Sequence, residues 1–438
     1  MIYEDFFEAN RHQILRDLAD LVAIPSESHD LPKVREALRF SLDLARRLGL
    51  RAESLLDEQI GIVEIGQGEE TCAILVHVDV VSTEGQDEWK TDPFEMTEID
   101  DELYGRGTLD DKGMVVASLY AMKAVVDSGI PLHKTIRMII GTQEEIEWTD
   151  IDRYVKEYPL PDYGFTPDGE YPLCNVEKGV VDCRMVFEIP CAEDGIREIH
   201  GGTVTNIVPG KAEVLLANGK TVSVRGKAVH ACQPEKGENA LFLLNKVLSD
   251  VTAPNDPAAA LLANTCEAFA DPFGSGIGLE SESEYYQGEF VHRNAMAPTI
   301  FQYDGQKAVL NVNLRFPYGE SEEHILERFR AFAEANGGQI TDVNALPAVF
   351  VSQNKPFIGA CVRAYEKVTG LKNEFALAYG GSYAKAMPNI VSWGPIFLGE
   401  EDTCHEPNEH ISIESLLKNG VIFSYALEEI AGTEESLK

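Results

Sequence analysis

The feature that most constrains the fold is a pair of apolar runs that each end in carboxylates or imidazole. TCAILVHVD and KTIRMIIGTQEE both read as buried strands. The first ends in His77 and Asp79, and the second ends in Glu144 and Glu145. In open α/β sheets, sites form beyond the carboxyl ends of the strands, so we expect these side chains to meet there. Metal ligands and a general base are the natural use of such side chains in that place.

Length and charge limit the class of protein. At 438 residues the chain exceeds a single ordinary core, so two domains are expected. A formal net charge of −36 argues against nucleic acid and anionic membranes as partners, because phosphates would be repelled. The N-terminus lacks the apolar segment of a signal peptide, and no apolar run is long enough to span a bilayer. The 8 scattered cysteines, without a CxxC pair, indicate reduced thiols in a cytoplasmic protein.

Helical and strand patterns alternate over the first 180 residues. Helices are expected at 3–22, 32–48, 112–127 and from 149, and strands at 51–56, 60–65, 72–78, 134–140 and 163–167. The candidate core positions of the third helix are Met114, Leu119, Met122 and Val126. Thr149 and Asp152 resemble a capping box at the start of the fourth helix. Such alternation predicts a mostly parallel sheet covered by helices on both faces.

The pattern changes after about residue 180. Period-two alternation and hairpin turns such as Asn218-Gly219 predict antiparallel strands. Helical spacing recurs within this part at 238–250 and 320–335, which makes it an α+β domain. From about residue 353 the first pattern resumes, with helices at 355–368 and 412–430 and a strand near 375–378. We therefore predict an α/β catalytic domain formed by 1–180 and 353–438, interrupted by an inserted α+β lid domain at 181–352.

Each candidate metal ligand has a structural alternative. In a strand, residues i and i+2 point the same way, so Asp79 can hold the second ring nitrogen of a metal-bound His77. The alternative is a strand-end histidine followed by an exposed aspartate. Asp110 follows a glycine-rich turn and precedes a helix, where a carboxylate can bridge two cations about 3.5–4 Å apart. The alternative is that Asp110 only caps the helix.

The same choice applies to the remaining candidates. Glu144 and Glu145 are adjacent, so one can bind metal while the other holds a water; a solvated acidic loop is the alternative. Asp168, in TPDGE, is also typical of a turn. His405, in DTCHEPNEH, is also compatible with a surface loop.

Taken together, the motifs are more specific than any one of them. The order HVDVV, GRGTLDDKG, GTQEE, PDGE and CHEPNE resembles the dinuclear-zinc metallopeptidase family, which includes aminoacylase, glutamate carboxypeptidase and carnosinase-type dipeptidases. The stretches WKTDPFE, YGRGTLDDKG and EKG, with the large insert, are most similar to bacterial PepV-type dipeptidases. The resemblance covers nearly the whole chain and is strongest outside the insert. Ser82 and Gln143 depart from the residues common in the family, but neither is a ligand position.

This resemblance implies a role for each motif residue. It implies that His77 and Asp168 bind one metal, that Glu145 and His405 bind the other, and that Asp110 bridges them. Glu144 would then be the general base, and Asp79 would orient His77. The resemblance also implies a cis peptide bond after the bridging aspartate, between Asp110 and Asp111.

Within the insert, the resemblance implies substrate-binding residues. VRGKAVHACQPEKGENA resembles the family's lid segment, in which His230 would polarise the scissile carbonyl or stabilise its oxyanion. Asn206 and Arg315 match lid positions that contact substrate, and an arginine suits a bidentate hold on a carboxylate. The alternatives are a partly buried structural histidine and an arginine paired with an acidic neighbour. Downstream, the backbone of Gly380, Gly381 and Ser382 can receive the substrate carboxylate, or can simply begin a helix.

The sequence thus predicts a dinuclear metallo-dipeptidase that hydrolyses small dipeptides with Glu144 as general base. The ligands without cysteine favour two Zn²⁺ ions and also admit Mn²⁺ or Co²⁺. One alternative is an N-acyl or N-succinyl amino acid deacylase of the same family, and another is a non-catalytic metal- or peptide-binding relative. We expect a cytoplasmic protein without nucleic-acid or membrane partners, and a monomer rather than a homodimer because the insert is long enough to cover the site alone.

Overall fold

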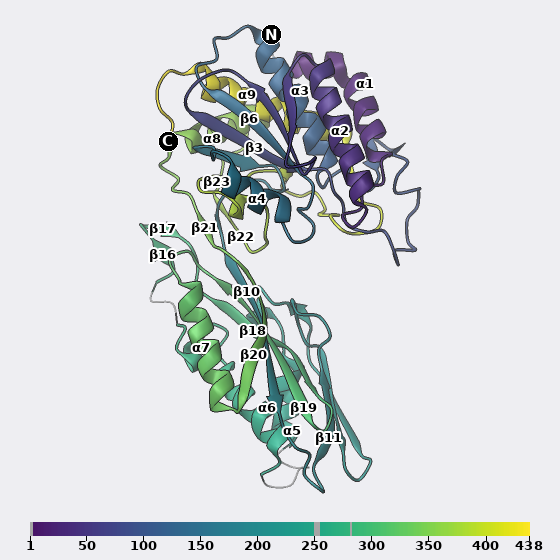
Figure 1. The fold of residues 1–438 in the computed structure, drawn as a ribbon, viewed down its shortest axis with the longest axis vertical. Helices are drawn as coiled ribbons and strands as arrows, with labels where there is room; N and C mark the ends of the chain where they lie inside the picture. The colour runs from purple at the N-terminus through teal and green to yellow at the C-terminus, as the bar shows by residue number, and fades with distance from the viewer. Residues whose placement is uncertain (1–2, 249–254, 281–282) are drawn as a thin grey trace. The chain divides into compact units, whose positions relative to one another are not determined.

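The computed structural model describes residues 3–248, 255–280 and 283–438, drawn as a ribbon in Figure 1. The chain divides into two compact units. Unit 1 comprises Met1–Asn175, Val351–Leu377 and Gly381–Lys438, and unit 2 comprises Val176–Phe350 and Ala378–Gly380. The chain therefore changes units near residues 175 and 350, where the sequence predicted domain boundaries after 180 and 352. The predicted fold class, a helix-flanked, mainly parallel sheet with an added antiparallel domain, is confirmed.

The central sheet of unit 1 carries the predicted catalytic strands. Its strands, in spatial order, are β1 (Arg51–Leu55), β2 (Ile60–Ile65), β6 (Thr135–Gly141), β3 (Thr71–His77), β7 (Tyr163–Thr166), β23 (Ile390–Ser392) and β9 (Cys174–Glu177). The strands β6, β3, β7 and β23 are parallel, while β1, β2 and β9 pair antiparallel with their neighbours. Because β3 and β6 are adjacent and parallel, their carboxyl ends lie at the same edge of the sheet. The sheet continues from β9 to β21 (Val349–Phe350), and β22 (Ala376–Ala378) also pairs with β9.

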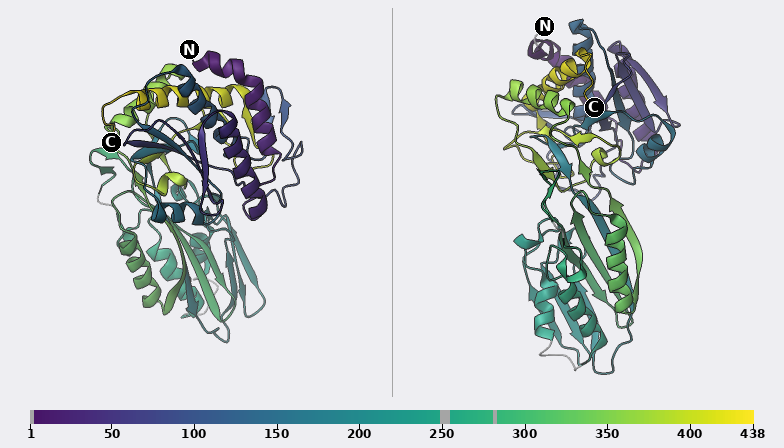
Figure 2. Two further views of the ribbon diagram at one scale, coloured as in Figure 1. Left: turned by 45° about the horizontal axis from the view of Figure 1, so that its top comes forward. Right: turned by 90° about the vertical axis from the view of Figure 1, so that its left-hand side faces the viewer.

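Helices cover both faces of this sheet. They are α1 (Tyr3–Val22), α2 (Leu31–Arg47), α3 (Lys112–Ser128), α4 (Thr149–Glu157), α8 (Pro356–Thr369) and α9 (Ile413–Gly432), with a short turn η3 (Tyr383–Lys385). Along β3, Ala73 and Leu75 pack on the face covered by α4 and η3, together with Ile151 and Tyr383. Alternate residues of a strand point to opposite faces, so Ile74 and its neighbours face the other helices. In that layer the N-terminal α1 and the C-terminal α9 lie side by side (Figure 2).

Short strands lie beside the main sheet of unit 1. One group is β4 (Thr97–Ile99), β5 (Glu102–Tyr104) and β25 (His410–Ser412), and the other is β8 (Gly169–Glu170) with β24 (Pro395–Ile396). In the first group, His410 pairs with Tyr104, so the chain near His405 runs next to the chain that leads to Asp110. Segments that are distant in the sequence thus meet beside the candidate ligands.

Unit 2 contains an antiparallel sheet with helices on one face. Its strands, in spatial order, are β14 (Thr221–Arg225), β13 (Lys211–Leu216), β11 (Ile196–Gly201), β18 (Ala295–Tyr303), β19 (Lys307–Phe316), β10 (Gly179–Glu188) and β20 (Gly338–Leu346). The helices are α5 (Ala240–Leu248), α6 (Pro257–Ala268) and α7 (Glu322–Ala335). Leu310, Val312 and Leu314 of β19 pack into the core with these helices. Asn313 and Arg315, at the alternate positions of the same strand, therefore lie on the opposite face.

Smaller elements complete unit 2. They are the strand pairs β12 (Ile207–Val208) with β15 (Val229–His230) and β16 (Tyr285–Tyr286) with β17 (Glu289–Phe290), and the turns η1 (Pro234–Lys236) and η2 (Ser275–Ile277). The predicted hairpin at Asn218-Gly219 is confirmed, because β13 and β14 pair across it and Gly219 has a φ of +79°. Of the helix predicted at 238–250, the last two residues lie outside the described residues.

Two local predictions are wrong. Val126 was expected in the core, but it is 42% exposed, whereas Val125 is buried. Residues 112–125 of α3 are buried nearly all round, so apolar spacing does not reveal which side opens to solvent. The capping box at the start of α4 is also absent: Trp148, with a φ of +55°, is the cap residue and makes no side-chain cap bond. The Thr149 hydroxyl donates instead to the side chain of Gln143.

None of the helices within residues 3–248, 255–280 and 283–438 has the length and apolar character needed to cross a bilayer.

Candidate functional site

His77 ends β3 and is buried. Its ring Nδ1 lies 3.0 Å from the main-chain carbonyl oxygen of Asp79 and 3.5 Å from that residue's Oδ1. A carbonyl oxygen only accepts hydrogen bonds, so Nδ1 carries a proton. Nε2 lies 3.0 Å from Oδ1 of Asp110, and despite burial the hydrogen bonds to Asp110 and Asp79 raise the pKa of His77 well above its ordinary value. Nε2 is therefore the nitrogen at which a cation would replace a proton.

The Asp79 carboxylate is fully buried and holds the loop that follows β6. Its Oδ1 accepts a hydrogen bond from the backbone N–H of Glu144 at 3.1 Å, and its Oδ2 accepts one from that of Glu145 at 3.2 Å. The hydroxyl of Ser28 donates to the same carboxylate at 2.9 Å. Asp79 therefore fixes two acidic residues besides contacting His77.

Asp110 lies between the two histidines of the candidate set. It is 7% exposed; its Oδ1 is 3.0 Å from His77 Nε2 and its Oδ2 is 3.0 Å from His405 Nε2. The peptide bond between Asp110 and Asp111 is cis, as the family resemblance predicted. The cap residue of α3 is Asp111, and it makes no side-chain cap bond. The alternative in which Asp110 only caps the helix therefore does not describe this loop.

Glu145 and His405 approach Asp110 from different loops. The Nε2 of His405 lies 3.0 Å from Oε2 of Glu145. Ligand atoms of His77, Asp110 and Glu145 lie within 4.8 Å of one another, as do those of His77, Glu144 and Asp168. The structure thus brings together every residue for which a metal or general-base role was predicted. They are His77, Asp110, Glu144, Glu145, Asp168 and His405.

The donor atoms of this cluster fit divalent cations. His77 Nε2 and Asp110 Oδ1 are buried and lie 3.0 Å from each other, while the buried Glu144 Oε1 has no hydrogen-bond partner among the residues that the structure describes. A buried carboxylate oxygen without a partner is costly unless an ion satisfies it. Imidazole nitrogen and carboxylate oxygen are also the ligands that zinc, manganese and cobalt accept.

Crowding and burial raise the pKa values of the carboxyl groups in this cluster, and a bound cation would lower them again. Burial, then repulsion by Asp110, raises the pKa of Glu145 to about 7. The same two causes raise the pKa of Asp168 to about 7. Burial, then Asp168, raises the pKa of Glu144 well above its ordinary value. Hydrogen bonding to Asp110 and Glu145 raises the pKa of His405 to about 11. The carboxylates of the cluster therefore repel one another more than the two histidines can offset. A bound cation would relieve this repulsion and lower the raised pKa values.

A second carboxylate supports the loop that carries the glutamates. Oδ2 of Asp150 accepts hydrogen bonds from the backbone N–H of Thr142 at 2.6 Å and of Gln143 at 3.1 Å. The hydroxyl of Tyr383 donates to the same oxygen at 2.9 Å. Gln143, where the sequence departs from the family pattern, therefore lies in this support and outside the ligand cluster. Sequence reasoning did not single out Asp150 or Tyr383, since nothing in their local motifs signals a buried hydrogen-bond network.

In unit 2, the structure brings Asn206 and His230 together. Ile207 pairs with His230, and the carbonyl of Asn206 accepts a hydrogen bond from the N–H of Ala231 at 2.8 Å. Nδ1 of His230 accepts from the N–H of Cys232 at 3.2 Å, which leaves the proton on Nε2. Burial and the nearby Arg315 lower the pKa of His230. The imidazole is therefore a neutral hydrogen-bond donor at its free nitrogen.

Arg315 is a buried cation held by neutral groups. Its Nη1 donates to the carbonyl of Tyr379 at 2.7 Å, and its Nε donates to Oδ1 of Asn313 at 3.2 Å. Within the described residues both of these hydrogen-bond partners are neutral, and Asp182 acts on the guanidinium through its charge alone. The alternative interpretation, in which Arg315 forms an ion pair with an acidic neighbour, therefore does not describe this part of unit 2. The ammonium of Lys178 lies 5.0 Å from the Tyr379 ring, which adds a second cation to the same part of unit 2.

The glycine turn at 380–382 begins a short helical turn, which was the structural alternative to a carboxylate site. Gly380 and Gly381 are exposed, and Ser382 is the cap residue of η3, accepting a hydrogen bond from the N–H of Ala384 at 3.3 Å.

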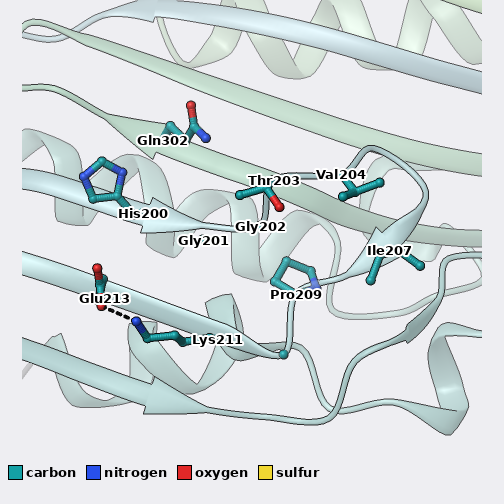
Figure 3. A pocket seen from close by; sticks show the side chains of 11 residues that line it. His200, Gly201, Gly202, Thr203, Val204, Ile207, Pro209, Lys211, Glu213 and Gln302 are labelled. Atoms are coloured by element: carbon teal, nitrogen blue, oxygen red, sulfur yellow. Dashed lines mark ion pairs between the residues drawn. The ribbon is translucent and has the colours of Figure 1, made fainter. Parts of the chain in front are cut away.

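A separate cavity of about 340 Å³ lies in unit 2 (Figure 3). Its lining combines apolar side chains and glycine backbone with the ion pair between Lys211 and Glu213 at 2.7 Å. Because those two charges neutralise each other, the cavity has no evident charge preference. It contains none of the predicted site residues.

Comparison with known proteins agrees with the geometry. The profile of peptidase family M20/M25/M40 matches residues 73–429. The chain belongs to peptidase family M20/M25/M40. It is accordingly a hydrolase of peptide bonds, and the family resemblance inferred from the motifs is confirmed.

Members and structural neighbours of the family match almost end to end. A protein of Staphylococcus aureus (strain MW2) named "Putative dipeptidase MW1694" is 31% identical over 467 aligned positions, covering 96% of this chain and 98% of its own. Aminoacylhistidine dipeptidase from Vibrio alginolyticus has a TM-score of 0.65 at 16% identity, covering 95% of this chain and 96% of its own. Human carnosine dipeptidase 1 has a TM-score of 0.62 at 16% identity, covering 98% of each chain. These structures share the fold of this M20 peptidase.

Proposed function

We propose that this M20 peptidase is a dinuclear metallo-dipeptidase. The observation that carries the proposal is the convergence of two histidines on one carboxylate, Asp110, whose oxygens are each 3.0 Å from an imidazole nitrogen. That arrangement suits a carboxylate that bridges two cations. The relatives named as dipeptidases support a small peptide as the substrate.

The proposal assigns ligands to two ions. His77 and Asp168 would hold one, Glu145 and His405 the other, and Asp110 both. Zinc suits this set best, and manganese or cobalt is compatible with its carboxylates. When bound, the ions would acidify a water molecule and polarise the scissile carbonyl group.

Glu144 is proposed as the general base. Its Oε1 is buried without a hydrogen-bond partner among the described residues, and Asp79 fixes its backbone. A carboxyl group whose pKa is raised by burial is suited to accept a proton from the attacking water. Glu144 would then deliver that proton to the nitrogen of the leaving amine, so the same side chain serves as base and acid.

Unit 2 is proposed to supply substrate-binding side chains. Arg315, a buried guanidinium with neutral partners, suits the C-terminal carboxylate of a peptide. His230, with a proton on its free nitrogen, suits the oxygen of the carbonyl under attack. Asn206 adjoins His230 and would contact the same part of the substrate. The backbone at Gly380, Gly381 and Ser382 remains a proposed contact for the carboxylate.

One experiment tests the assignment as a whole. The purified chain is analysed for bound metal and then assayed, with Zn²⁺, Mn²⁺ and Co²⁺ in turn, against dipeptides, β-alanyl dipeptides, and N-acetyl and N-succinyl amino acids. We expect two metal equivalents and fastest turnover of a dipeptide. Preference for N-acyl amino acids would replace the dipeptidase assignment with a deacylase. Absence of hydrolysis with all three metals would contradict catalysis at this site.

We further propose a cytoplasmic monomer. All 8 cysteines are free thiols, and most are buried, which suits a reducing compartment. Gel filtration with light scattering measures the oligomeric state directly.

A further inference from the structure

Glu409 is a fully buried carboxylate that grips the loop leading to Asp110. Its Oε1 accepts hydrogen bonds from the backbone N–H groups of Gly107 at 2.9 Å, Leu109 at 2.9 Å and Asp110 at 3.0 Å. Its Oε2 accepts from Nη1 of Arg106 at 2.7 Å. One side chain thus collects donors from four consecutive or nearly consecutive residues. Carboxylates bound to several backbone N–H groups are among the strongest local anchors in proteins.

The same network reaches His405 through a second route. The other guanidinium nitrogen of Arg106, Nη2, donates to Oε1 of Gln86 at 2.8 Å. Nε2 of Gln86 donates to the main-chain carbonyl of His405 at 2.9 Å. The indole N–H of Trp89 also donates to Gln86, at 3.2 Å. Glu409 lies four residues after His405 in the chain, so the network is tied to the His405 loop at both Glu409 and the His405 carbonyl.

His405 needs such support more than the other candidate ligands do. Its side chain is 55% exposed, and its backbone has a φ of +66°, a conformation that non-glycine residues seldom adopt. It lies on a loop, whereas His77 ends a strand in the middle of the sheet. A half-exposed loop residue has many accessible orientations, so its capture by an ion costs entropy unless the loop is already ordered.

We infer that Glu409, Arg106 and Gln86 form a positioning network that holds Asp110 and His405 ready to bind the metal pair. The inference rests on the proposed ligand roles of those two residues and adds a function for the long loop at 82–95. Gln86 belongs to that loop, and Asn408 ties it further by accepting a hydrogen bond from the N–H of Lys90 at 2.6 Å. None of the three network residues touches substrate or metal in this scheme. They act through the backbone of the ligands.

Gln86→Ala gives the cleanest test because Gln86 is only half-buried and its loss leaves the core intact. The matched control is Gln59→Ala, since Gln59 is also half-buried in unit 1 and also accepts a hydrogen bond from an arginine, Arg153, at 3.3 Å. Glu409→Gln is the stronger variant. It keeps the shape but places an amide N–H₂ against backbone or guanidinium donors and leaves Arg106 buried without its charge partner.

The readouts are the metal dissociation constants from competition with a chromogenic chelator, the absorption spectrum of the Co²⁺-loaded protein, and the Tm of the metal-free protein. We expect Gln86→Ala to weaken metal binding about 10- to 100-fold and to change the Co²⁺ spectrum, as loss of a residue that orients a ligand does elsewhere. Its metal-free Tm should lie only about 2–4 °C below that of Gln59→Ala, because the buried Arg106 loses one acceptor. Glu409→Gln should show at least as large a loss of affinity.

Wild-type affinity and spectrum in Gln86→Ala would overturn the inference, whatever the folding of Glu409→Gln. The variants Asp110→Asn and His405→Ala separate this result from a failure of the proposed function. If they lose metal while Gln86→Ala does not, the ligand assignment stands and only the positioning network falls. If they also bind metal normally, the ligand assignment itself is wrong, and the inference falls with it.

Discussion

The carboxylate of Asp79 accepts a hydrogen bond of 3.1 Å from the backbone N–H of Glu144. Its other oxygen accepts one of 3.2 Å from Glu145, and its main-chain carbonyl lies 3.0 Å from the ring of His77. One residue therefore sets the orientation of an imidazole on β3 and of two carboxylates after β6. A change at Asp79 should consequently affect metal binding and turnover together.

Asp79→Asn should lower metal affinity about 10- to 100-fold and reduce kcat as well. Asparagine keeps one acceptor oxygen but places an N–H₂ group against a backbone N–H or the hydroxyl of Ser28. Calorimetric titration of metal into the metal-free protein, with parallel kinetics, measures both effects. Asp152→Asn, at an exposed position on α4, serves as the control and should change neither. Normal metal affinity in Asp79→Asn would show that these hydrogen bonds do not organise the centre.

Glu144→Ala should retain two metal equivalents and the wild-type Tm yet lose turnover. Loss of a general base costs about 100- to 10,000-fold in kcat. The measurement is kcat for a dipeptide in samples whose metal content has been determined by mass spectrometry. Substantial activity in a metal-replete Glu144→Ala sample would refute the base assignment. Loss of a metal ion in that variant would instead make Glu144 a ligand.

Arg315→Ala should raise KM for dipeptides that have a free C-terminal carboxylate. Removing one partner of a buried, hydrogen-bonded charge pair costs about 2–5 kcal/mol, or about 30- to 4,000-fold in kcat/KM. The comparison is with the same dipeptides as C-terminal amides, for which wild type and variant should be equally poor. Arg184→Ala, at an exposed position of β10, is the control. Equal losses on the acid and the amide would exclude a carboxylate contact.

His230→Ala should reduce kcat far more than metal affinity. An oxyanion donor is worth about 100- to 1,000-fold in kcat, and His230 belongs to unit 2 while the proposed metal ligands belong to unit 1. His200→Ala changes an exposed histidine of the same unit and should behave as wild type. Matching losses of metal binding and turnover in His230→Ala would argue against a role confined to substrate.

Lys178 gives unit 2 a pH-dependent stability. Burial, only partly offset by Cys232 and Glu235, lowers the pKa of its ammonium to about 8, against about 10.4 in an unfolded chain. Between these values the unfolded chain holds a proton that the folded chain has released, so the free energy of unfolding increases with pH. Relative to Lys178→Met, the wild type should gain about 3 kcal/mol between pH 8 and pH 10.5. Urea unfolding at several pH values measures this difference, and a flat or falling difference would contradict the burial effect.

Strand patterns and motif order predicted most of the catalytic unit because both are local properties. The runs that became β3 and β6 are continuously apolar, and each ends in the residues that the structure brings together. Helix faces were harder to predict where a helix is apolar all round, as Val126 shows. The start of α4 was misread because Trp148, in a left-handed conformation, is the cap residue, and its indole N–H donates to the carbonyl of Glu144 at 2.5 Å without capping the helix.

The supporting carboxylates lay beyond sequence reasoning for a different reason. Glu409 and Asp150 are acidic residues in polar stretches, and most such residues are solvated. Their partners, Arg106 and Tyr383, are hundreds of positions away in the chain. Only the fold reveals that these carboxylates are buried, because a buried acidic residue does not change the hydrophobic periodicity of the sequence around it.

The insertion of unit 2 within unit 1 has a consequence for biosynthesis. A ribosome releases Asp168 before any of unit 2 and His405 only after all of it. The proposed centre cannot be complete on a nascent chain until His405 has emerged. If the proposed ligands are right, a chain that ends before residue 405 would lack the second histidine and could not hold both metal ions.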